Sequence, residues 1–517
     1  MKRAHLLVLS LCLTASTGCI RWEDADASWC NDAVLERRHD VCGRADTSIA
    51  GPVPGIEASQ RFGGEGLDTV AALASLPSGM WFGGSFDAPM KLGTTSLVSS
   101  GDADAYLARM DAEGRFVSAV SFGGFGADRV VDVQAGPADS LYVAAQFQSH
   151  TTLPGGGNLS SEGELDSLLL RLDSTLQPLA SVSFAAEPGA RVEVRDLAYD
   201  RGRVVVAGRL VGYMNLGGVR VGNGGPAAFL AVLDEDLRPL GQVATGSCTD
   251  AIGDSAAVGE QGVFFTFRIH VDPLGPGCVL LNQPLDPGFS AWRDVLVRID
   301  DAETSAPFIP PDWAFQFPDS VRNPYQLLTG SNPVLVTSKP GYEAPNSVAV
   351  LGEELVFMRH TPDSSQQRRP WAEVSFRSAG SALPTRGPNT IGRANSTQVG
   401  LGQDLHAKMQ VGEDGALWVF GEFKDDRMLL GSLVNGPFVN ARHGFVRVYH
   451  DTDPTQDWAR VLVGRSPSVG AMVTAVAVDP SGRAWIAGNF EGDVVASHQW
   501  LDAKGSDGFL FITEPAL

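Results

Sequence analysis

Carboxylates are the side chains of this sequence that are best suited to chemistry. The chain holds 60 Asp and Glu against 39 Lys and Arg, and a pair of carboxylates that face each other across a cleft can hydrolyse glycosidic bonds. The sequence alone places no two carboxylates in this way. The motifs of serine hydrolases, zinc peptidases and nucleotide-binding loops do not occur. We therefore predict no catalytic residue and no cofactor.

Two Asp residues occupy equivalent places in the chain. Asp68 and Asp128 each follow a Phe-Gly-Gly segment at the same distance, while Ala190 stands at the third such place. A ligand-binding role would need the carboxylate in every copy that binds. The change to Ala favours an Asp that braces a loop.

A second group of Asp matches part of a calcium-binding loop. Asp451, Asp453 and Asp457 have suitable spacing, but Thr455 and Gln456 stand where an oxygen-rich side chain and a glycine are expected. A solvated turn explains the segment better, and we predict no metal site.

The first residues have the features of a secretory signal. Lys2 and Arg3 precede an apolar stretch from Ala4 to Leu13, which is too short to span a bilayer as a helix. The following Ala15–Cys19 resembles a bacterial lipobox, with Ser16 in place of the usual Leu. Ordinary signal cleavage is the alternative. We predict a signal peptide over residues 1–18 and lipidation of Cys19.

Four cysteines remain after the lipidated one, an even number in an oxidising compartment. Proximity favours the pairs Cys30–Cys42 and Cys248–Cys278 among three possible pairings. Closing these loops contributes about 3 and 3.5 kcal/mol in the chain-entropy model. A metal site is disfavoured because the sequence has neither CxxC nor His at ligand spacing.

Positive charge gathers in one segment of an otherwise acidic chain. Residues 359–408 hold seven basic and three acidic side chains, whereas the whole chain has a net charge of -21. The segment departs from the repeat described below and is rich in turn-forming residues, so we expect loops, where binding sites often lie. Arginines paired with the acidic body are the alternative. The candidates for anion binding are Arg368, Arg369, Arg377, Arg386 and Arg393.

Composition limits the fold. Glycine is abundant, at 59 of 517 residues, and only 19% of residues are charged, which favours short strands and turns over long helices. An apolar fraction of 44% excludes wholesale disorder. The negative charge disfavours nucleic-acid binding, which requires clustered positive charge.

Three short patterns recur in a fixed order. The first is a strand ending in Phe-Gly-Gly or a remnant of it, at Arg61–Gly64, Ser121–Gly124, Ser183–Phe184, Val243–Ala244, Trp313–Ala314, Trp371–Ala372 and Trp458–Ala459. The second is aromatic-x-x-Gly-x-Phe, with clear or weaker copies starting at Trp81, Tyr142, Val205, Phe264, Trp418 and Trp485. The third is a hydrophobic strand running into an acidic turn, at Asp104–Asp111, Asp166–Asp173, Ala227–Asp234, Asp294–Asp300, Gly444–Asp451 and, truncated, Asp507–Leu510.

The period of these patterns is near 60 residues, with several strands and no helix in each copy. Such a repeat is typical of a propeller blade. Seven openings of the first pattern predict seven blades, and six or eight are possible because the copy around residues 301–406 is degenerate. Because Trp81, Trp418 and Trp485 recur in register, we expect them in the core and not on a sugar-binding platform. Gly84, Gly208, Gly421 and Gly488 stand in mid-strand, where glycine marks a bulge or a close backbone approach.

These motifs resemble the bacterial β-propeller repeats of the SBBP type, over about residues 56–512. The resemblance implies an all-β propeller in an extracytoplasmic setting and implies no reaction. Ile56–Gly64 offers the strand that the final Asp507–Ile512 segment lacks, so we expect the N- and C-terminal strands to pair and close the ring. Residues 19–55 would form a lipid-anchored tether with a small disulfide loop, and residues 56–517 the propeller.

The predicted function is binding or scaffolding without catalysis. We expect a monomer, anchored by its lipid in the bacterial outer membrane and facing the periplasm or the cell surface. Loops on one propeller face would bind an anionic glycan or an envelope protein. The alternative is a hydrolase or lyase that acts on envelope polysaccharide at the propeller funnel.

Overall fold

The computed structural model is built from antiparallel strands, so the predicted all-β class is confirmed. It describes residues 54–246 and 470–515 almost without gaps, most of 248–299, and chiefly the strands between 336 and 464. The predicted signal peptide and nearly all of the tether lie outside the described residues. Within the described part of the chain, no helix has the length and apolar character to span a bilayer.

Groups of four strands follow one another, and within each group the strands pair in chain order. Small hairpins extend several of the groups. The first group comprises β2 (Asp68–Leu76), β3 (Gly79–Phe86), β6 (Asp104–Met110) and β7 (Phe116–Phe122), with the hairpin β4 (Met90–Leu92) and β5 (Thr95–Leu97). The second comprises β8 (Arg129–Ala135), β9 (Leu141–Phe147), β12 (Asp166–Leu172) and β13 (Pro178–Ala186), with the hairpin β10 (His150–Thr152) and β11 (Asn158–Ser160). The third comprises β14 (Arg191–Asp200), β15 (Arg203–Leu216), β16 (Val219–Asp234) and β17 (Pro239–Ala244).

The second half of the chain repeats this order. A group is formed by β18 (Asp250–Gly259), β19 (Gly262–Val271), β22 (Ala291–Ile299) and β23 (Val336–Thr337), with the hairpin β20 (Cys278–Leu280) and β21 (Gln283–Leu285). The next is formed by β24 (Pro345–Leu351), β25 (Glu354–Pro362), β26 (Pro370–Ser378) and β27 (Asn389–Ile391). It is followed by β28 (Leu405–Val411), β29 (Leu417–Lys424), β32 (Arg442–Tyr449) and β33 (Trp458–Gly464), with the hairpin β30 (Arg427–Leu429) and β31 (Leu433–Asn435). The last contains β34 (Gly470–Val478), β35 (Arg483–Ala496) and β36 (Gln499–Pro515).

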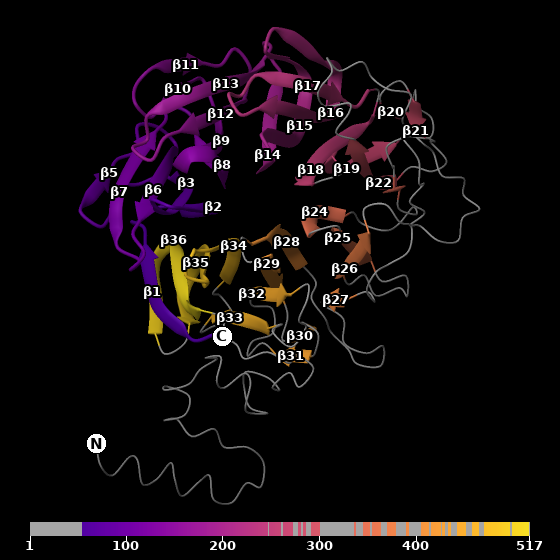
Figure 1. Ribbon diagram of the computed structural model, residues 1–517. Coiled ribbons are helices and arrows are strands. Elements are labelled where there is room, and N and C mark those ends of the chain that lie inside the picture. The colour runs from indigo at the N-terminus through magenta and orange to yellow at the C-terminus, as the bar shows by residue number, and fades with distance from the viewer. Residues whose placement is uncertain are drawn as a thin grey trace, which may run out of the picture.

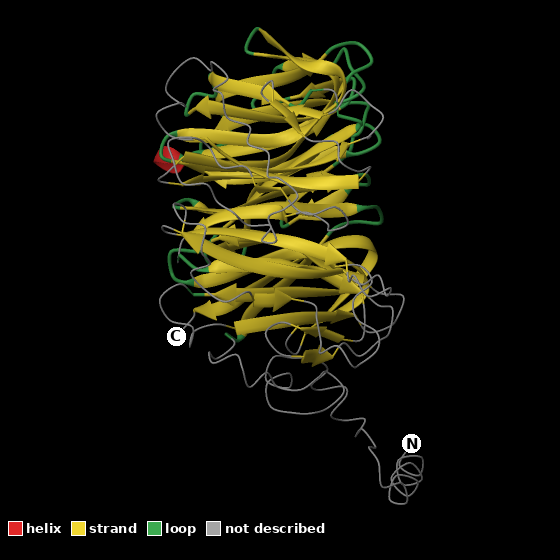
Figure 2. Cartoon of the chain, turned by 90° about the vertical axis from the view of Figure 1, so that its right-hand side faces the viewer, coloured by secondary structure: helices red, strands yellow, loops and turns green. Residues whose placement is uncertain are grey.

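The sheets lie around a common centre, with the first strand of each group innermost (Figure 1). Contacts lead from β2 through β8, β14, β18 and β24 to β28, from β29 to β34, and from β34 back to β2. Viewed from the side, the strands run through the thickness of the body and many turns lie at its two faces (Figure 2). Loops on either face can therefore vary without disturbing the sheets.

The last group takes its fourth strand from the other end of the described chain. β1 (Ile56–Phe62) pairs antiparallel with β36, from Ile56 opposite Thr513 to Phe62 opposite Gly508. The predicted pairing of these two segments is therefore present. It covers an edge of β36 that would otherwise expose unpaired N–H and C=O groups.

The hydrophobic core consists of layers between neighbouring sheets. One layer joins residues of β2, β3 and β6 to Trp485, Leu510 and Ile512 from the last group. Trp81 and Trp485 are fully buried, and Trp418 is 3% exposed. A sugar-binding platform needs an accessible ring face, so the prediction that these tryptophans belong to the core is confirmed.

Bulges in the innermost strands explain glycines of the second pattern. β2, β14 and β34 each shift register by one residue beside Gly84, Gly208 and Gly488 of the partner strand. A Cβ atom at any of these glycines would overlap a backbone carbonyl oxygen of the bulged strand. Close backbone approach, as predicted, therefore accounts for these three.

The cysteines that the structure describes agree with the predicted pair. Cys248 and Cys278 form a disulfide with Cα atoms 4.2 Å apart. Both are buried in the layer between the third and fourth groups. The predicted Cys30–Cys42 pair and the lipidated Cys19 lie outside the described residues.

Candidate functional site

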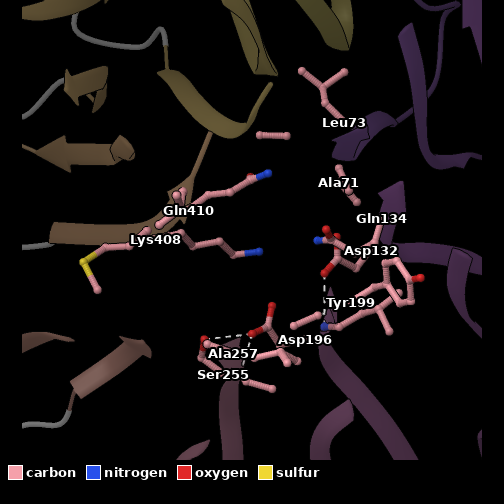
Figure 3. A pocket seen from close by; sticks show the side chains of 18 of the residues that line it. Ala71, Leu73, Asp132, Gln134, Asp196, Tyr199, Ser255, Ala257, Lys408 and Gln410 are labelled. Atoms are coloured by element: carbon pink, nitrogen blue, oxygen red, sulfur yellow. Dashed lines mark hydrogen bonds between the residues drawn. The ribbon is translucent and has the colours of Figure 1, made fainter. Parts of the chain in front are cut away.

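The innermost strands surround a cavity of about 200 Å³. Its lining comes mainly from β2, β8, β14, β18, β28 and β34. Polar side chains point into it from opposite sides (Figure 3). They are Asp132 and Gln134 from β8, Asp196 from β14, Ser255 from β18, and Lys408 and Gln410 from β28.

The bulges set the direction of the two carboxylates. The pairing of β8 with β9 shifts immediately before Asp132, and that of β14 with β15 shifts immediately before Asp196. An extra residue re-aims the side chains that follow it. Similar shifts precede Ala72 in β2 and Ser255 in β18, so these four residues occupy corresponding positions. Neighbouring strands thereby bring Asp132 and Asp196 to the same cavity.

Each carboxylate accepts hydrogen bonds from the next sheet. Asp132 Oδ2 accepts the Leu197 N–H at 3.1 Å, while its Oδ1 accepts the Val133 N–H at 2.7 Å. Asp196 Oδ2 accepts the Ala256 N–H at 2.7 Å and the Ser255 O–H at 2.8 Å. The two side chains therefore link three consecutive sheets at the axis.

The surroundings hold a proton on this pair near neutral pH. Both carboxyls are half-buried, because they face the cavity yet lie deep among the sheets. Desolvation raises the pKa of Asp132 to about 7, and the Asp196 charge adds to the shift. Desolvation also raises the pKa of Asp196, against hydrogen bonds from Ala256 and Ser255. The Lys408 ammonium lowers the pKa of both groups, and the two titrate as a pair.

The cavity can hold a proton, waters or a small polar ligand. A carboxyl pair on one side and an ammonium group on the other would suit a molecule with both donors and acceptors. The volume is below the roughly 300–1,000 Å³ of typical ligand pockets. The arrangement therefore offers polar recognition in a confined space.

We expect Asp132→Asn to flatten the pH dependence of the unfolding free energy between about pH 4 and pH 7. The folded state keeps this proton up to about pH 7, whereas the unfolded state releases it near 3.8. The folded state then binds more protons across this window, so stability falls as pH rises. Removing the group should reduce that slope by up to about 1.4 kcal/mol per pH unit. Urea unfolding in EDTA at a series of pH values measures it.

Asp111→Asn is the control, because hydrogen bonds and the charge of Arg115 hold the pKa of Asp111 below its usual value despite slight desolvation. Its loss should leave the slope above about pH 5 unchanged. Parallel curves of unfolding free energy against pH for wild type and Asp132→Asn would contradict a raised pKa for Asp132.

The structure does not describe the side chains of the residues predicted to bind anions. Arg377 belongs to β26, whereas Arg368, Arg369, Arg386 and Arg393 lie outside the described residues, as do Asp451–Asp457. No group of three or more His, Cys, Asp or Glu suited to a metal occurs among the residues that the structure describes.

The interpretation of Asp68 and Asp128 as loop braces agrees with their contacts. Asp68 Oδ2 accepts the Gly64 N–H at 2.6 Å, and Asp128 Oδ2 accepts the Gly124 N–H at 2.8 Å. The third copy needs a correction, because its equivalent residue is Val192 and not Ala190. The Val192 N–H donates to the Leu165 carbonyl as the Asp128 N–H donates to that of Ala103, and the turn before β14 is longer.

Sequence reasoning did not single out Asp132, Asp196 or Lys408 as a site. Strand alternation predicts which side chains share a face, but each bulge reverses the alternation after it. A usable signal was the recurrence of Val-x-Asp followed by Val or Leu, at Val130–Val133 and Val194–Leu197. Lys408 belongs to the basic segment, yet its strand carries it to the axis.

Comparisons with known proteins assign no family. No family model matches the chain, and no curated protein matches it. Among solved structures, it is similar to a protein of unknown function from Dyadobacter fermentans DSM 18053, at 10% identity and a TM-score of 0.37. The match covers 74% of this chain and 93% of the other. A likeness at this level carries no argument about fold or function.

Proposed function

We propose that the chain is a seven-bladed β-propeller that acts as a lipid-anchored binding or scaffold module of a bacterial envelope. The repeated four-stranded groups around one centre support the propeller. The pairing of β1 with β36 supports a last blade that β1 completes and a ring that this blade closes. The signal-like N-terminus and the lipobox-like Ala15–Cys19 support an anchor at Cys19 in the outer membrane. The SBBP-type repeats support an extracytoplasmic location.

The hydrogen bonds that the cavity carboxylates accept are the observation that supports a non-enzymatic role. Asp132 and Asp196 accept backbone N–H groups of the adjoining sheets, and Asp196 also accepts the Ser255 O–H. A general acid or nucleophile must exchange protons or bonds with a substrate. These oxygens instead hold neighbouring sheets together, so recognition falls to the loops on the faces.

The proposed partner is an anionic glycan or an envelope protein that presents negative charge. The basic segment of residues 359–408 supplies positive side chains on a chain whose overall charge is -21. Clustered arginines bind carboxylates and phosphates with bidentate geometry. Such binding weakens as salt screens the charges.

Co-sedimentation with purified envelope fragments at low ionic strength tests this function. We expect Arg368→Glu with Arg369→Glu to reduce sedimentation roughly fivefold to tenfold, because two attractive charges become repulsive. Asp132→Asn with Asp196→Asn should sediment like wild type, since the axis would not contact the partner. Equal sedimentation of the arginine variant and wild type would contradict the proposal.

A hydrolase or lyase that acts on envelope polysaccharide is the second candidate, favoured by the coupled carboxyls opposite Lys408. A carboxyl with a pKa near 7 can serve as a general acid. This activity would be established if wild type releases reducing ends from envelope glycan and the variant Asp132→Asn with Asp196→Asn does not. If neither protein releases reducing ends, the binding module is the better proposal.

A further inference from the structure

Pairs of buried carboxylates recur at the Phe-Gly-Gly turns, away from the axial cavity. At the second turn, a Cβ atom placed on Gly123 would lie 2.5 Å from Asp104 Oδ1 and 2.9 Å from Asp128 Oδ2. At the first turn, a Cβ on Gly63 would collide with both Asp507 and Asp68. Glycine thus leaves room for two carboxylates to approach one point at each turn.

The carboxylates of the second turn are only half satisfied. Asp104 Oδ2 accepts the Ser100 N–H at 2.9 Å, and Asp128 Oδ2 accepts the Gly124 N–H at 2.8 Å. The Oδ1 atoms of both are buried and accept no hydrogen bond from the residues that the structure describes. Asp104 is 2% and Asp128 1% exposed. Two buried negative charges this close require a positive charge or a proton.

The first turn provides that positive charge from the chain itself. Arg61 Nε lies 2.6 Å from Asp507 Oδ2. Ser121 stands at the place of Arg61 in the second turn, because both residues immediately precede the Phe-Gly-Gly phenylalanine. Within the described part of the chain, no ion pair joins Asp104 or Asp128 to a basic side chain. The second turn therefore has the same carboxylates without the guanidinium.

The third turn shows that the basic residue is dispensable when one carboxylate is absent. Asp166 corresponds to Asp104, but the buried Val192 replaces the second Asp. Asp166 Oδ1 accepts the Ala186 N–H at 3.1 Å, and Ser183 stands at the place of Arg61. The first turn thus has two carboxylates and an Arg, the second has two carboxylates and no Arg, and the third has one carboxylate and no Arg.

We propose that Asp104 and Asp128 bind a hard divalent cation of the Ca²⁺ class at the second turn. Carboxylate oxygens are preferred ligands of such ions, and water or backbone carbonyls complete the coordination. Desolvation raises the pKa of Asp128 to about 7, against hydrogen bonds from Gly124 and Gln148, and the Asp104 charge adds to the rise.

Exchange of the basic residue between turns tests the site in the full chain. Calcium bound per chain is measured by equilibrium dialysis and calorimetry with CaCl₂ at about pH 8. We expect Ser121→Arg to bind one Ca²⁺ fewer than wild type, because its guanidinium replaces the ion. Arg61→Ser should bind one Ca²⁺ more, since Asp68 and Asp507 lose their Arg partner. Ser183→Arg is the matched control and should leave the number unchanged.

Stability gives a second readout. Saturating CaCl₂ should raise the wild-type Tm by about 2–5 °C, and Asp104→Asn should remove most of this shift. The difference between variants is unaffected by calcium bound elsewhere on the chain. The proposal is overturned if Ser121→Arg and Asp104→Asn bind as much Ca²⁺ as wild type. It is also overturned if saturating CaCl₂ leaves the wild-type Tm unchanged.

Discussion

We expect a chain that ends at Ser506 to be unfolded at physiological temperature and to show no cooperative thermal transition on heating. The deletion removes the partner of β1, which pairs with residues 508–513. It also removes Phe509, Leu510, Phe511 and Ile512, all at most 2% exposed. Burying each contributes about 1.5–3 kcal/mol, so their sum is comparable to the roughly 5–15 kcal/mol stability of a whole domain.

Circular dichroism during heating, together with the soluble yield, measures this loss. A chain that ends at Pro515 is the control, because it retains all of β36. It should melt like wild type. A truncation at Ser506 that keeps the full Tm would show that pairing of the terminal strands does not stabilise the fold.

Gly488→Ala is expected to destabilise the protein by about 2–4 kcal/mol. Gly488 of β35 pairs with Val473 of β34, where β34 shifts register. A Cβ atom at this position would overlap the backbone oxygen of Met472 and the ring of Phe509. The oxygen belongs to a paired strand and cannot move away like the end of a flexible side chain, so the sheet itself must distort.

Gly470→Ala provides a matched control at the start of β34. Its Cβ atom would lie 3.5 Å from the Arg442 side chain, an ordinary contact, and we expect a change within about 1 kcal/mol. Urea unfolding of both variants at one pH gives the comparison. Equal losses at the two positions would remove the argument that the bulge requires glycine at position 488.

Local pattern and length predict much of this fold. The recurrence of Trp81 and Trp485 in register predicts buried strands, because a repeated unit places equivalent residues in equivalent surroundings. The Cys248–Cys278 pair follows from proximity along the chain, and the β1–β36 pairing from a segment that lacks its neighbour. These inferences need only strand periodicity, the count of strands in each repeat and the spacing of residues along the chain.

The axial site depends on geometry that local pattern does not contain. Asp132 and Asp196 belong to different groups, and a bulge before each one changes the face that it occupies. Lys408 reaches the same cavity from the side opposite Asp132 (Figure 3). The turn before β14 has two extra residues, so Val192 and not Ala190 corresponds to Asp128. Bulges and turn lengths are set by contacts between sheets, which a single repeat does not show.

The position of β1 also determines when the protein can finish folding. Arg61 and Asp507 touch although 446 positions separate them. At roughly 5–20 residues per second of synthesis, the first strand waits roughly 20–90 s before its partner has been made. Any nascent chain that stops late carries almost every sheet but leaves an apolar seam open beside β2. Such a product would expose backbone and apolar side chains that the β1–β36 pair covers in the full chain, and we expect it to be more open to proteolysis than the full chain.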